Sequence, residues 1–306
     1  MARTELFSRS QPGGVFTIAN WRNLPNEGWF VDSTAGTDAA GFGYNPDAPF
    51  DSIDYAIGKA AAGDVIYVAP WHVENITTAT AINADVAGVT IEGVRMGYLM
   101  PTITATAAAG ALTVAAANVT IKNLRFVAGF ATGVTQGIAV AAAGDGCTLD
   151  GLEFRDTTTN EEYLVHINVA TTVDNLTIRN CSLVGLTGGS MTNSILFAGT
   201  STNTTIEDCY IFVDSSDSVI DHAVAAAVNC KITRCTIAND DTGAAGYCIQ
   251  HHADGTGTSS DCRLSYNKID APVVAGAKIW WFENYATNTI GTSSGVLTPL
   301  AGAAVP

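Results

Sequence analysis

The segment VTIKNLRF at residues 119–126 decides the fold, because close copies of it return along much of the chain. The copies align without gaps and are VTIEGVRM (89–96), CTLDGLEF (147–154), LTIRNCSL (176–183), TTIEDCYI (204–211), CKITRCTI (230–237) and CRLSYNKI (262–269). Their third residue is always Ile or Leu, and successive copies lie about 29 residues apart. Repeats of about 20 to 50 residues are typical of solenoids, so we predict one structural coil per repeat.

Two columns of this alignment predict a core. The anchor column, which is the third residue of each repeat, holds Ile91, Ile121, Leu149, Ile178, Ile206, Ile232 and Leu264. The column five positions later holds Met96, Phe126, Phe154, Leu183, Ile211, Ile237 and Ile269. Side chains of a straight strand alternate between its two faces, so two apolar columns an odd number of residues apart cannot share one face. We therefore predict two short strands in each repeat, separated by a bend.

The residue type between the columns supports this bend. Two positions after the anchor stand Gly93, Asn123, Gly151, Asn180, Asp208, Arg234 and Tyr266. Gly, Asn and Asp adopt left-handed backbone angles most readily. Asn75, Asn118, Asn175, Asn180 and Asn203 begin Asn-X-Ser/Thr triplets, which we interpret as turn composition and not as glycan acceptors. A bend repeated about every 29 residues predicts an all-β, single-stranded parallel β-helix of about seven to eight coils.

The position after the anchor should face solvent, and its charge alternates. This column holds Glu92, Lys122, Asp150, Arg179, Glu207 and Thr233. Stacked strands lie about 4.8 Å apart, so opposite charges of neighbouring coils should form ion pairs worth roughly 0–1 kcal/mol each. We expect the alternation to fix the register, because a slipped coil would bring like charges together.

Cysteine usage favours free thiols. The chain has seven cysteines, an odd number, and no CxxC pair, which argues against a zinc site and against a full disulfide framework. Cys181, Cys209 and Cys235 stand three positions after their anchors and should point inward on successive coils as small apolar side chains. A disulfide or a metal site remains the alternative for this column.

Composition excludes several classes of function. The chain of 306 residues has 14 Lys and Arg against 29 Asp and Glu, a formal net charge of -15. Binding to nucleic acid or to anionic membranes needs clustered basic side chains, so we expect neither as a partner. No apolar core of a signal peptide and no apolar run of 18 residues is visible, so we expect synthesis in a host cytoplasm.

An open solenoid end needs a cap, and the region before the first repeat provides one. Residues 51–62, DSIDYAIGKAAA, place Ile53, Ala56, Ile57 and Ala60 on one face of a predicted capping helix. Asp51 or Ser52 can cap its N-terminus, and Gly63 can end it. A strand, GDVIYVAP (63–70), should follow.

Residues 30–76 add a resemblance to a known family. They combine V-D-x-x-x-G-x-D, a Pro-Phe before the short helix and G-D-x-I-Y-V-x-P, and so resemble the N-terminal segment of pectin-lyase-like right-handed β-helix proteins of the phage type. The resemblance covers residues 28–285 and implies a right-handed helix. It says little about activity, since this scaffold serves lyases, hydrolases, tailspikes and non-enzymatic virion proteins. Residues 1–27 and 286–306 fall outside it and are interpreted as an irregular arm and an extended tail that dock on a neighbouring subunit or are disordered.

Polar and aromatic side chains of the later coils form the one candidate site. His166, His222, His251 and Trp281 fall roughly 16 to 19 residues after their anchors, which could bring them to one face. The predicted patch comprises His166, Asp221, His222, His251, His252, Trp280, Trp281 and Glu283. It could bind a glycan with Trp280 or Trp281 as a stacking platform, or act as a subunit interface, where His and Trp are also common. The loops between strands look too short to wall a catalytic groove, and we assign no catalytic residue, metal or cofactor.

These observations favour a structural protein over an enzyme. The first expectation is a phage virion protein, most simply a homotrimeric capsid decoration protein that contacts the major capsid protein or other virion proteins. The trimer is implied by the resemblance to viral β-helices and not by the spacing. The alternatives are a tailspike or polysaccharide depolymerase and a glycan-binding adhesin without catalysis.

Overall fold

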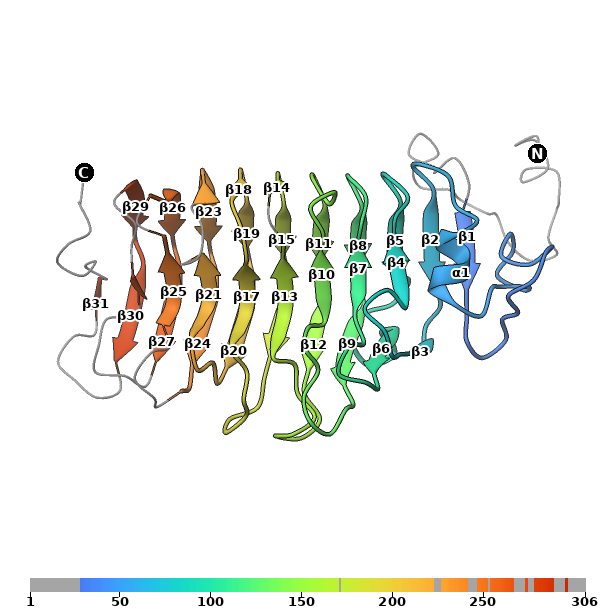
Figure 1. Ribbon diagram of the computed structural model, residues 1–306, viewed down its shortest axis with the longest axis horizontal. Coiled ribbons are helices and arrows are strands. Elements are labelled where there is room, and N and C mark those ends of the chain that lie inside the picture. Colours follow the sequence, from blue (N-terminus) through green and yellow to red (C-terminus); the bar gives the residue numbers. More distant parts are fainter. Residues whose placement is uncertain are drawn as a thin grey trace, which may run out of the picture.

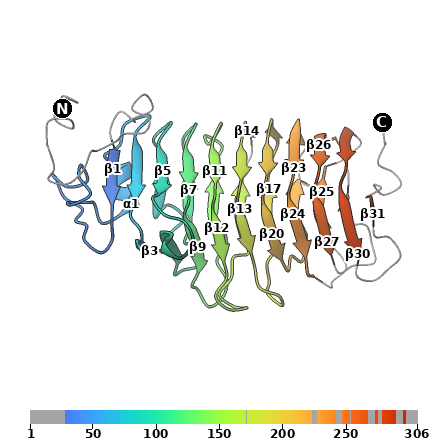
Figure 2. The same ribbon diagram turned by 180° about the vertical axis from the view of Figure 1, so that it is seen from behind.

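The computed structural model describes residues 28–170, 172–222, 227–241, 247–252, 254–266, 273–274, 278–288 and 295–296. They form an all-β, right-handed parallel β-helix of about seven turns, as predicted, with the strands stacked along the long axis of the molecule (Figures 1 and 2). Within the described residues every pairing between strands is parallel except that of β30 with β31.

Each coil contributes one strand to each of three long sheets, numbered here in the order in which a coil enters them. Sheet 1 consists of β1 (Gly28–Val31), β2 (Val65–Val68), β5 (Thr90–Gly93), β8 (Thr120–Lys122), β11 (Thr148–Asp150), β15 (Thr177–Arg179), β19 (Thr205–Glu207), β23 (Cys230–Thr233), β26 (Thr256–Ser260) and β29 (Lys278–Phe282). Sheet 2 consists of β3 (Val73–Ile76), β6 (Thr102–Ala105), β9 (Arg125–Ala128), β12 (Glu153–Arg155), β16 (Ser182–Val184), β20 (Tyr210–Val213), β24 (Thr236–Asn239), β27 (Arg263–Tyr266), β30 (Tyr285–Asn288) and β31 (Gly295–Val296). Sheet 3 consists of β4 (Ile82–Ala84), β7 (Leu112–Val114), β10 (Ile138–Val140), β13 (Val165–Val169), β17 (Asn193–Phe197), β21 (Ser218–His222), β25 (Tyr247–His251) and β28 (Val273–Val274). A short fourth sheet joins β14 (Val173–Asp174), β18 (Ser201–Thr202) and β22 (Ala227–Val228).

The two predicted core columns are confirmed through the middle of the solenoid. Residues of the anchor column pair directly from coil to coil in sheet 1, from Ile91 to Ile232. Those of the second column pair in the same way in sheet 2, from Phe126 to Ile237. All of them are fully buried, and Phe126 stacks on Phe154 with ring centroids 4.8 Å apart. Burial of these stacked files is the main stabilising contribution to the fold.

The predicted register of the last repeat is wrong. Ile232 pairs with Ser259, while Leu264 pairs with Ile237 in sheet 2. Leu264 therefore belongs to the second column, and the bend lies at Asp261 and not at Tyr266. The cause is the polar Ser259 at the anchor position, which removed the apolar signal that marks a repeat. Ile269 lies outside the described residues.

The first repeat also departs from the prediction, because a loop interrupts it. Met96 was expected to point inward, yet it is 63% exposed. Residues 94–101, which include the short 3-10 helix η3 (Gly97–Leu99), bulge from the coil before β6 begins. Ile103 instead pairs with Phe126 and fills the core position that was assigned to Met96.

Left-handed residues make two of the corners of each coil. The corner between sheets 1 and 2 has positive φ at Asn123, Gly151, Asn180, Asp208, Arg234 and Asp261. The predicted Gly93 does not share it, since the loop after β5 widens this turn. A second corner, three positions before the anchor, has positive φ at Gly63, Gly88, Asn118, Gly146, Asn175, Asn203 and Asn229. The turn interpretation of Asn118, Asn175, Asn180 and Asn203 is thereby confirmed, whereas Asn75 lies within β3.

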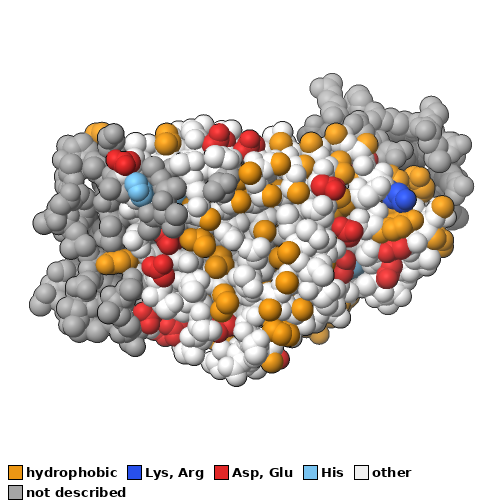
Figure 3. All heavy atoms as spheres, in the orientation of Figure 1, with side chains coloured by type: hydrophobic (Ala, Val, Ile, Leu, Met, Phe, Trp, Pro, Cys, Tyr) orange, Lys and Arg blue, Asp and Glu red, His pale blue; other side chains and the backbone are white. Residues whose placement is uncertain are grey.

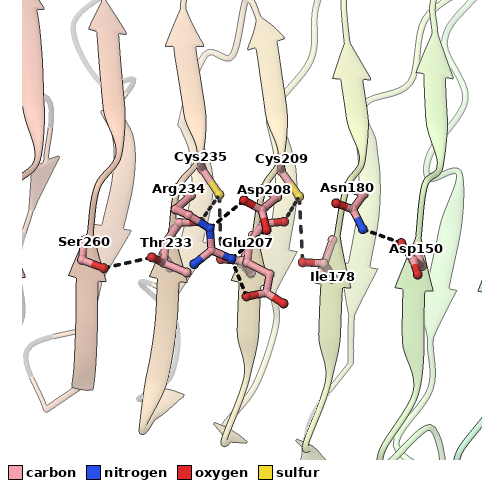
Figure 4. Close-up of polar contacts among 12 residues, drawn as sticks. Asp150, Ile178, Asn180, Glu207, Asp208, Cys209, Thr233, Arg234, Cys235 and Ser260 are labelled. Atoms are coloured by element: carbon pink, nitrogen blue, oxygen red, sulfur yellow. Dashed lines mark hydrogen bonds and ion pairs between the residues drawn. The ribbon is translucent and has the colours of Figure 1, made fainter.

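The charge ladder on sheet 1 forms in part. Lys122 Nζ lies 3.4 Å from Glu92, and Arg179 lies 2.9 Å from Asp150. The next cation is the corner residue Arg234, which binds both Glu207 and Asp208 (Figure 4). Most charges on this surface therefore meet a partner on the neighbouring coil.

All seven cysteines are buried and free, as predicted. Cys181, Cys209, Cys235 and Cys262 form an inward column. Each thiol lies 3.7–3.9 Å from a backbone carbonyl of the preceding coil, that of Cys209 from Ile178 for example (Figure 4). The column therefore replaces larger apolar side chains where the coil is narrow.

The N-terminal cap is shorter than predicted. Helix α1 spans Ile53–Ile57, with the Ser52 hydroxyl accepting from the backbone N–H of Tyr55. It buries Ile53, Ala56 and Ile57 as expected, but ends at Gly58 and not near residue 62. Asp64 accepts a hydrogen bond from the N–H of Ala61 and turns the chain into β2. The predicted arm, residues 1–27, and most of the tail lie outside the described residues, although Gly295–Val296 pairs antiparallel with β30.

Candidate functional site

Histidine 166 of the predicted patch lies inside the solenoid. His166 is fully buried in β13, where its ring packs against Phe154 and Tyr163. Its Nδ1 lies 2.9 Å from the Ser194 hydroxyl of the next coil. Burial lowers the pKa of His166 to about 3, so this ring is neutral at neutral pH and cannot reach a surface ligand.

Two further histidines form an internal stack at the C-terminal half. The His222 ring stacks on Phe197 at 3.8 Å and on His251 at 5.4 Å between centroids. Burial, followed by the neighbouring His251, holds the pKa of His222 well below its usual range, and burial lowers the pKa of His251 to about 4. Asp221, the adjacent residue, is also buried. The two histidine rings pack inside the solenoid, and Asp221 accepts a hydrogen bond from Asn193 Nδ2 at 3.4 Å.

The remaining members of the predicted patch lie apart. Trp280 is 51% exposed on β29 of sheet 1, and Glu283 is exposed at a left-handed corner. His252 follows β25 at the end of a sheet 3 strand, 3.9 Å from Asp254. The side chain of Trp281 lies outside the described residues. The described residues of the predicted patch thus lie partly inside the solenoid and partly on separate surfaces. They do not form one groove.

The outer surface of sheet 2 contains a pocket that the sequence did not reveal. Its volume is about 240 Å³, and it lies over β12 and β16. It is lined by Glu153, Arg155, Asp156, Ser182, Val184 and Leu186. The loops at 129–137, 156–164 and 185–192, which leave sheet 2 toward sheet 3, are longer than expected and project at the lower edge of Figure 1. They give this surface the wall that the sequence seemed to lack.

Asp156 is the residue of this pocket with unusual chemistry. Its two carboxyl oxygens accept hydrogen bonds from the backbone N–H groups of Tyr163 (3.0 Å) and Leu186 (3.2 Å). Burial is the largest influence and raises the pKa, the two N–H donors oppose it, and the nearby Glu162 raises it further. The result is a pKa raised to about 7 for Asp156, so this carboxyl group keeps a proton at far higher pH than an ordinary aspartic acid and can donate it.

Two arginines meet at Glu153 beside this carboxyl group. Arg125 donates from Nε and Nη2 to Glu153 Oε2 at 3.2 and 3.1 Å. Arg155 donates to the other oxygen, Oε1, while its side chain remains 60% exposed. The carboxylate of Glu153 is thus neutralised by two guanidinium groups, of which that of Arg155 lines the pocket.

A second carboxylate stabilises the pocket wall. Glu162 is buried, and its Oε1 accepts from the backbone N–H and the hydroxyl of Ser190 at 2.6 and 2.5 Å. Its Oε2 is buried without a hydrogen-bond partner among the described residues. Glu162 and Asp156 together tie loop 156–164 to loop 185–192, so the wall is preorganised.

Charge separates the faces of the solenoid. None of the sheet 3 strands contains Lys or Arg, whereas sheet 2 carries Arg125, Arg155 and Arg263, and sheet 1 carries Lys122, Arg179, Lys231 and Lys278. The face shown in Figure 3 has few basic side chains, and Asp and Glu gather toward its margins. Basic side chains on the strands thus occur on sheets 1 and 2, and among them Arg155 lines the pocket.

No group of three or more His, Cys, Asp or Glu side chains suited to a metal ion occurs among the described residues. In the same part of the chain, no helix is long and apolar enough to cross a membrane.

Known proteins resemble this chain in fold alone. A rhamnogalacturonan lyase superposes with a TM-score of 0.59 at 14% identity, over 85% of this chain and 74% of its own. Pectate lyase Pel9A gives 0.54 at 12% identity, over 88% and 79%. The GH136 lacto-N-biosidase from Eubacterium ramulus gives 0.50 at 12% identity, over 86% and 64%. No family model and no curated protein sequence matches the chain. The pectin-lyase-like fold is confirmed, and the phage type stays a prediction.

Proposed function

We propose that this protein binds a polysaccharide across the outer surface of sheet 2 and hydrolyses it, with Asp156 as the general acid. The observation that carries this proposal is a partly buried carboxyl group that lines an open pocket and whose pKa is raised to about 7. Perturbed carboxyl groups in pockets mark candidate active sites. The lyases and the biosidase of similar fold act on saccharides according to their names, which agrees with this choice.

The chemistry assigned to the pocket is that of glycosidic cleavage. Asp156 transfers its proton to the glycosidic oxygen while the bond from that oxygen to the sugar carbon breaks. Water adds its hydroxyl group to the sugar carbon, and its remaining proton goes to the Asp156 carboxylate, which restores the acid. Glu153 and Arg155 hold the sugar hydroxyl groups by hydrogen bonds, and the loops at 156–164 and 185–192 exclude solvent from one side.

A second candidate function is saccharide binding without cleavage. Its supporting observation is that both oxygens of Asp156 already accept backbone N–H groups. Such a carboxyl group can serve the loops alone. In that case the saccharide still occupies the same surface, but Asp156 contributes no proton.

The substitution Asp156→Asn should abolish cleavage and leave binding intact. Asn keeps one acceptor oxygen for the loops but has no acidic proton. A panel of polygalacturonate, rhamnogalacturonan and a purified bacterial capsule polysaccharide should reveal one that is cleaved, measured by new reducing ends. We expect the rate to fall by at least about 100-fold, and the rate of the unaltered protein to decline above pH 7 as Asp156 loses its proton.

The matched control is Asp145→Asn. Asp145 also accepts a backbone N–H, that of Asp174 at 2.8 Å, but it lies in the connection from sheet 3 to sheet 1, away from the pocket. This variant should cleave normally. Binding of a panel member without cleavage supports the second candidate, while absence of both binding and cleavage across the panel contradicts the proposed function.

The virion role, the homotrimer and a location in a virus particle remain predictions from the sequence. A polysaccharide-degrading tailspike would reconcile them with the pocket on sheet 2. Mass measurement of the purified protein in solution tests the trimer directly.

A further inference from the structure

An exposed apolar cluster lies on the first coils, outside the pocket. Its centre is the contacting pair Trp71 and Tyr98, which we call the aromatic platform, and the exposed side chains of Val73, Val94 and Met96 lie close to them in the sequence. Trp71 is 53% exposed and Tyr98 is 80% exposed, and their rings meet edge to face at 4.7 Å between centroids. Large exposed aromatic side chains grouped in this way mark a binding surface more often than scattered ones do.

The backbone holds Trp71 in this position at a cost. Trp71 has φ 68°, in the left-handed region that a bulky side chain rarely adopts. The next residue, His72, is fully buried and fixed on both sides: Nδ1 accepts from the N–H of Ser33, and Nε2 lies 3.1 Å from Glu74. Since His72 points inward, the strained turn presents Trp71 to solvent. Local strain of this kind is concentrated at functional sites.

The loop that carries Tyr98 is attached to the pocket. Arg125 Nη2 donates to the backbone carbonyl of Gly97 at 2.7 Å. The same guanidinium group forms the two hydrogen bonds to Glu153 that are described above. One arginine therefore fixes both the platform loop and a carboxylate that lines the pocket.

The register of sheet 2 places platform and pocket on one line. Val73 pairs with Thr102, Thr102 with Arg125, and Arg125 with Glu153. Glu153 pairs in turn with Ser182, which lines the pocket. Three strand spacings of about 4.8 Å separate Val73 from Glu153, about 14 Å in all, so a ligand extended across the strands can touch both.

We propose that the aromatic platform is a second binding subsite, on which the face of Trp71 stacks against a sugar ring of the polysaccharide held at the pocket, while Tyr98, perpendicular to it, contacts the edge of the same sugar. This inference rests on the proposed function, since it assigns a further subsite to the same ligand. The apolar face of a sugar ring can pack on an aromatic ring while its hydroxyl groups remain in water, which suits side chains that are half exposed.

Charge disfavours the other occupants of this cluster. A second copy of the chain also carries a net charge of -15, which opposes close approach of two such surfaces. An anionic lipid surface is repelled for the same reason. A saccharide needs no charge complementarity with the platform, and the line from Val73 to Ser182 gives it a continuous path.

The substitution Trp71→Ala tests the subsite. We expect it to weaken binding of the panel polysaccharide by about tenfold, measured by affinity electrophoresis, while the maximal rate of cleavage at saturating polysaccharide is unchanged. The matched control is Trp280→Ala, which removes a tryptophan of similar exposure (51%) from sheet 1. That variant should bind like the unaltered protein. Circular dichroism establishes that both variants are folded, and Tyr98→Ala provides a second probe that leaves the turn at Trp71 unaltered.

The outcomes separate this inference from the proposed function. Unchanged affinity in both Trp71→Ala and Tyr98→Ala overturns the subsite while cleavage through Asp156 stands. If only Trp280→Ala loses affinity, the subsite on the aromatic platform is also overturned. Trp280, the stacking residue predicted from the sequence, would then bind the sugar. Sedimentation showing that Trp71→Ala dissolves a dimer or trimer would assign the platform to self-association and overturn the subsite as well.

Discussion

Raising the pH above about 9 should unfold this protein far more steeply than a typical β-sheet domain. Burial raises the pKa of Cys147, Cys230 and Cys248 to about 12. The hydrogen bond with Cys209, followed by burial, raises the pKa of Cys235 to about 12. Hydrogen bonds with neighbouring thiols and burial also raise the pKa of Cys209 and Cys262. In the unfolded chain a thiol ionises near pH 8.5.

The sign follows from proton binding in the two states. Above about pH 8.5 the folded protein retains six protons that the unfolded chain loses, so stability falls as the pH rises. Each thiol lowers the folding equilibrium constant by about tenfold per pH unit. Six together cost on the order of 8 kcal/mol per pH unit, comparable to the whole stability of a domain. Urea unfolding at pH 7, 8, 9 and 10, followed by circular dichroism, measures this loss.

Thiol labelling provides the control for this prediction. Iodoacetamide at pH 9 should leave the six cysteines of the folded protein unmodified and should label them all after unfolding. The variant Cys147→Ala should reduce the dependence of stability on pH by about one proton. Rapid labelling of these cysteines in the folded protein, or stability unchanged between pH 8 and 10, would show that the thiols are not held neutral in the core.

Lowering the pH should destabilise the protein through its three internal histidines. The folded pKa of His166, His222 and His251 is lowered by burial, whereas the unfolded chain takes up these protons near pH 6.5. The stability that the three neutral histidines contribute is therefore fully present above about pH 6.5 and is lost as the pH falls toward 4. Asp156 acts in the opposite direction, because its folded pKa of about 7 lies above the unfolded value of about 4. Between pH 6 and 4 the unfolded chain binds three more protons at the histidines and one fewer at Asp156 than the folded protein does. The net difference of two protons lowers the folding equilibrium constant by about 100-fold per pH unit.

Two variants divide this effect into its parts. His222→Phe keeps an aromatic ring stacked on Phe197, whose ring centroid lies 3.8 Å from that of His222. This variant should reduce the fall of the folding constant to about tenfold per pH unit. Asp156→Asn removes the opposing group and should increase it to about 1000-fold. Urea unfolding between pH 7 and 4.5 gives both numbers, and a His222→Phe variant with the same pH dependence as the unaltered protein would refute the assignment.

The sequence predicted the fold well where packing repeats. The columns from Ile91 to Ile232 and from Phe126 to Ile237 are visible in the letters because each coil buries the same positions. The prediction failed where a polar side chain, Ser259, occupies an anchor position, and where the loop after Gly93 replaces Met96 by Ile103. Repeated apolar positions predict which residues of a strand are buried, but they do not predict where a loop is inserted between two strands.

The candidate site could not be found in the same way. Histidines attract attention in a sequence because they are chemically versatile, but His166, His222 and His251 are packed internally. Asp156 resembles any other loop aspartate until the structure brings Tyr163, Leu186 and Glu162 around it. One signal was present in the sequence, namely the outward-facing pair Glu153 and Arg155 just before a long acidic loop. The pKa of Asp156 is raised by burial and by Glu162, and both effects exist only in the folded protein.

Hydrogen exchange with and without the panel polysaccharide that binds tests most directly whether sheet 2 is the ligand surface. Bound saccharide should slow exchange in peptides that cover 153–164 and 182–192, with a smaller effect at 94–101, and should leave the sheet 3 strands β13, β17 and β21 unaffected. Protection confined to sheet 3 or to sheet 1 around Trp280, with the two pocket loops exchanging as in the free protein, would contradict the account.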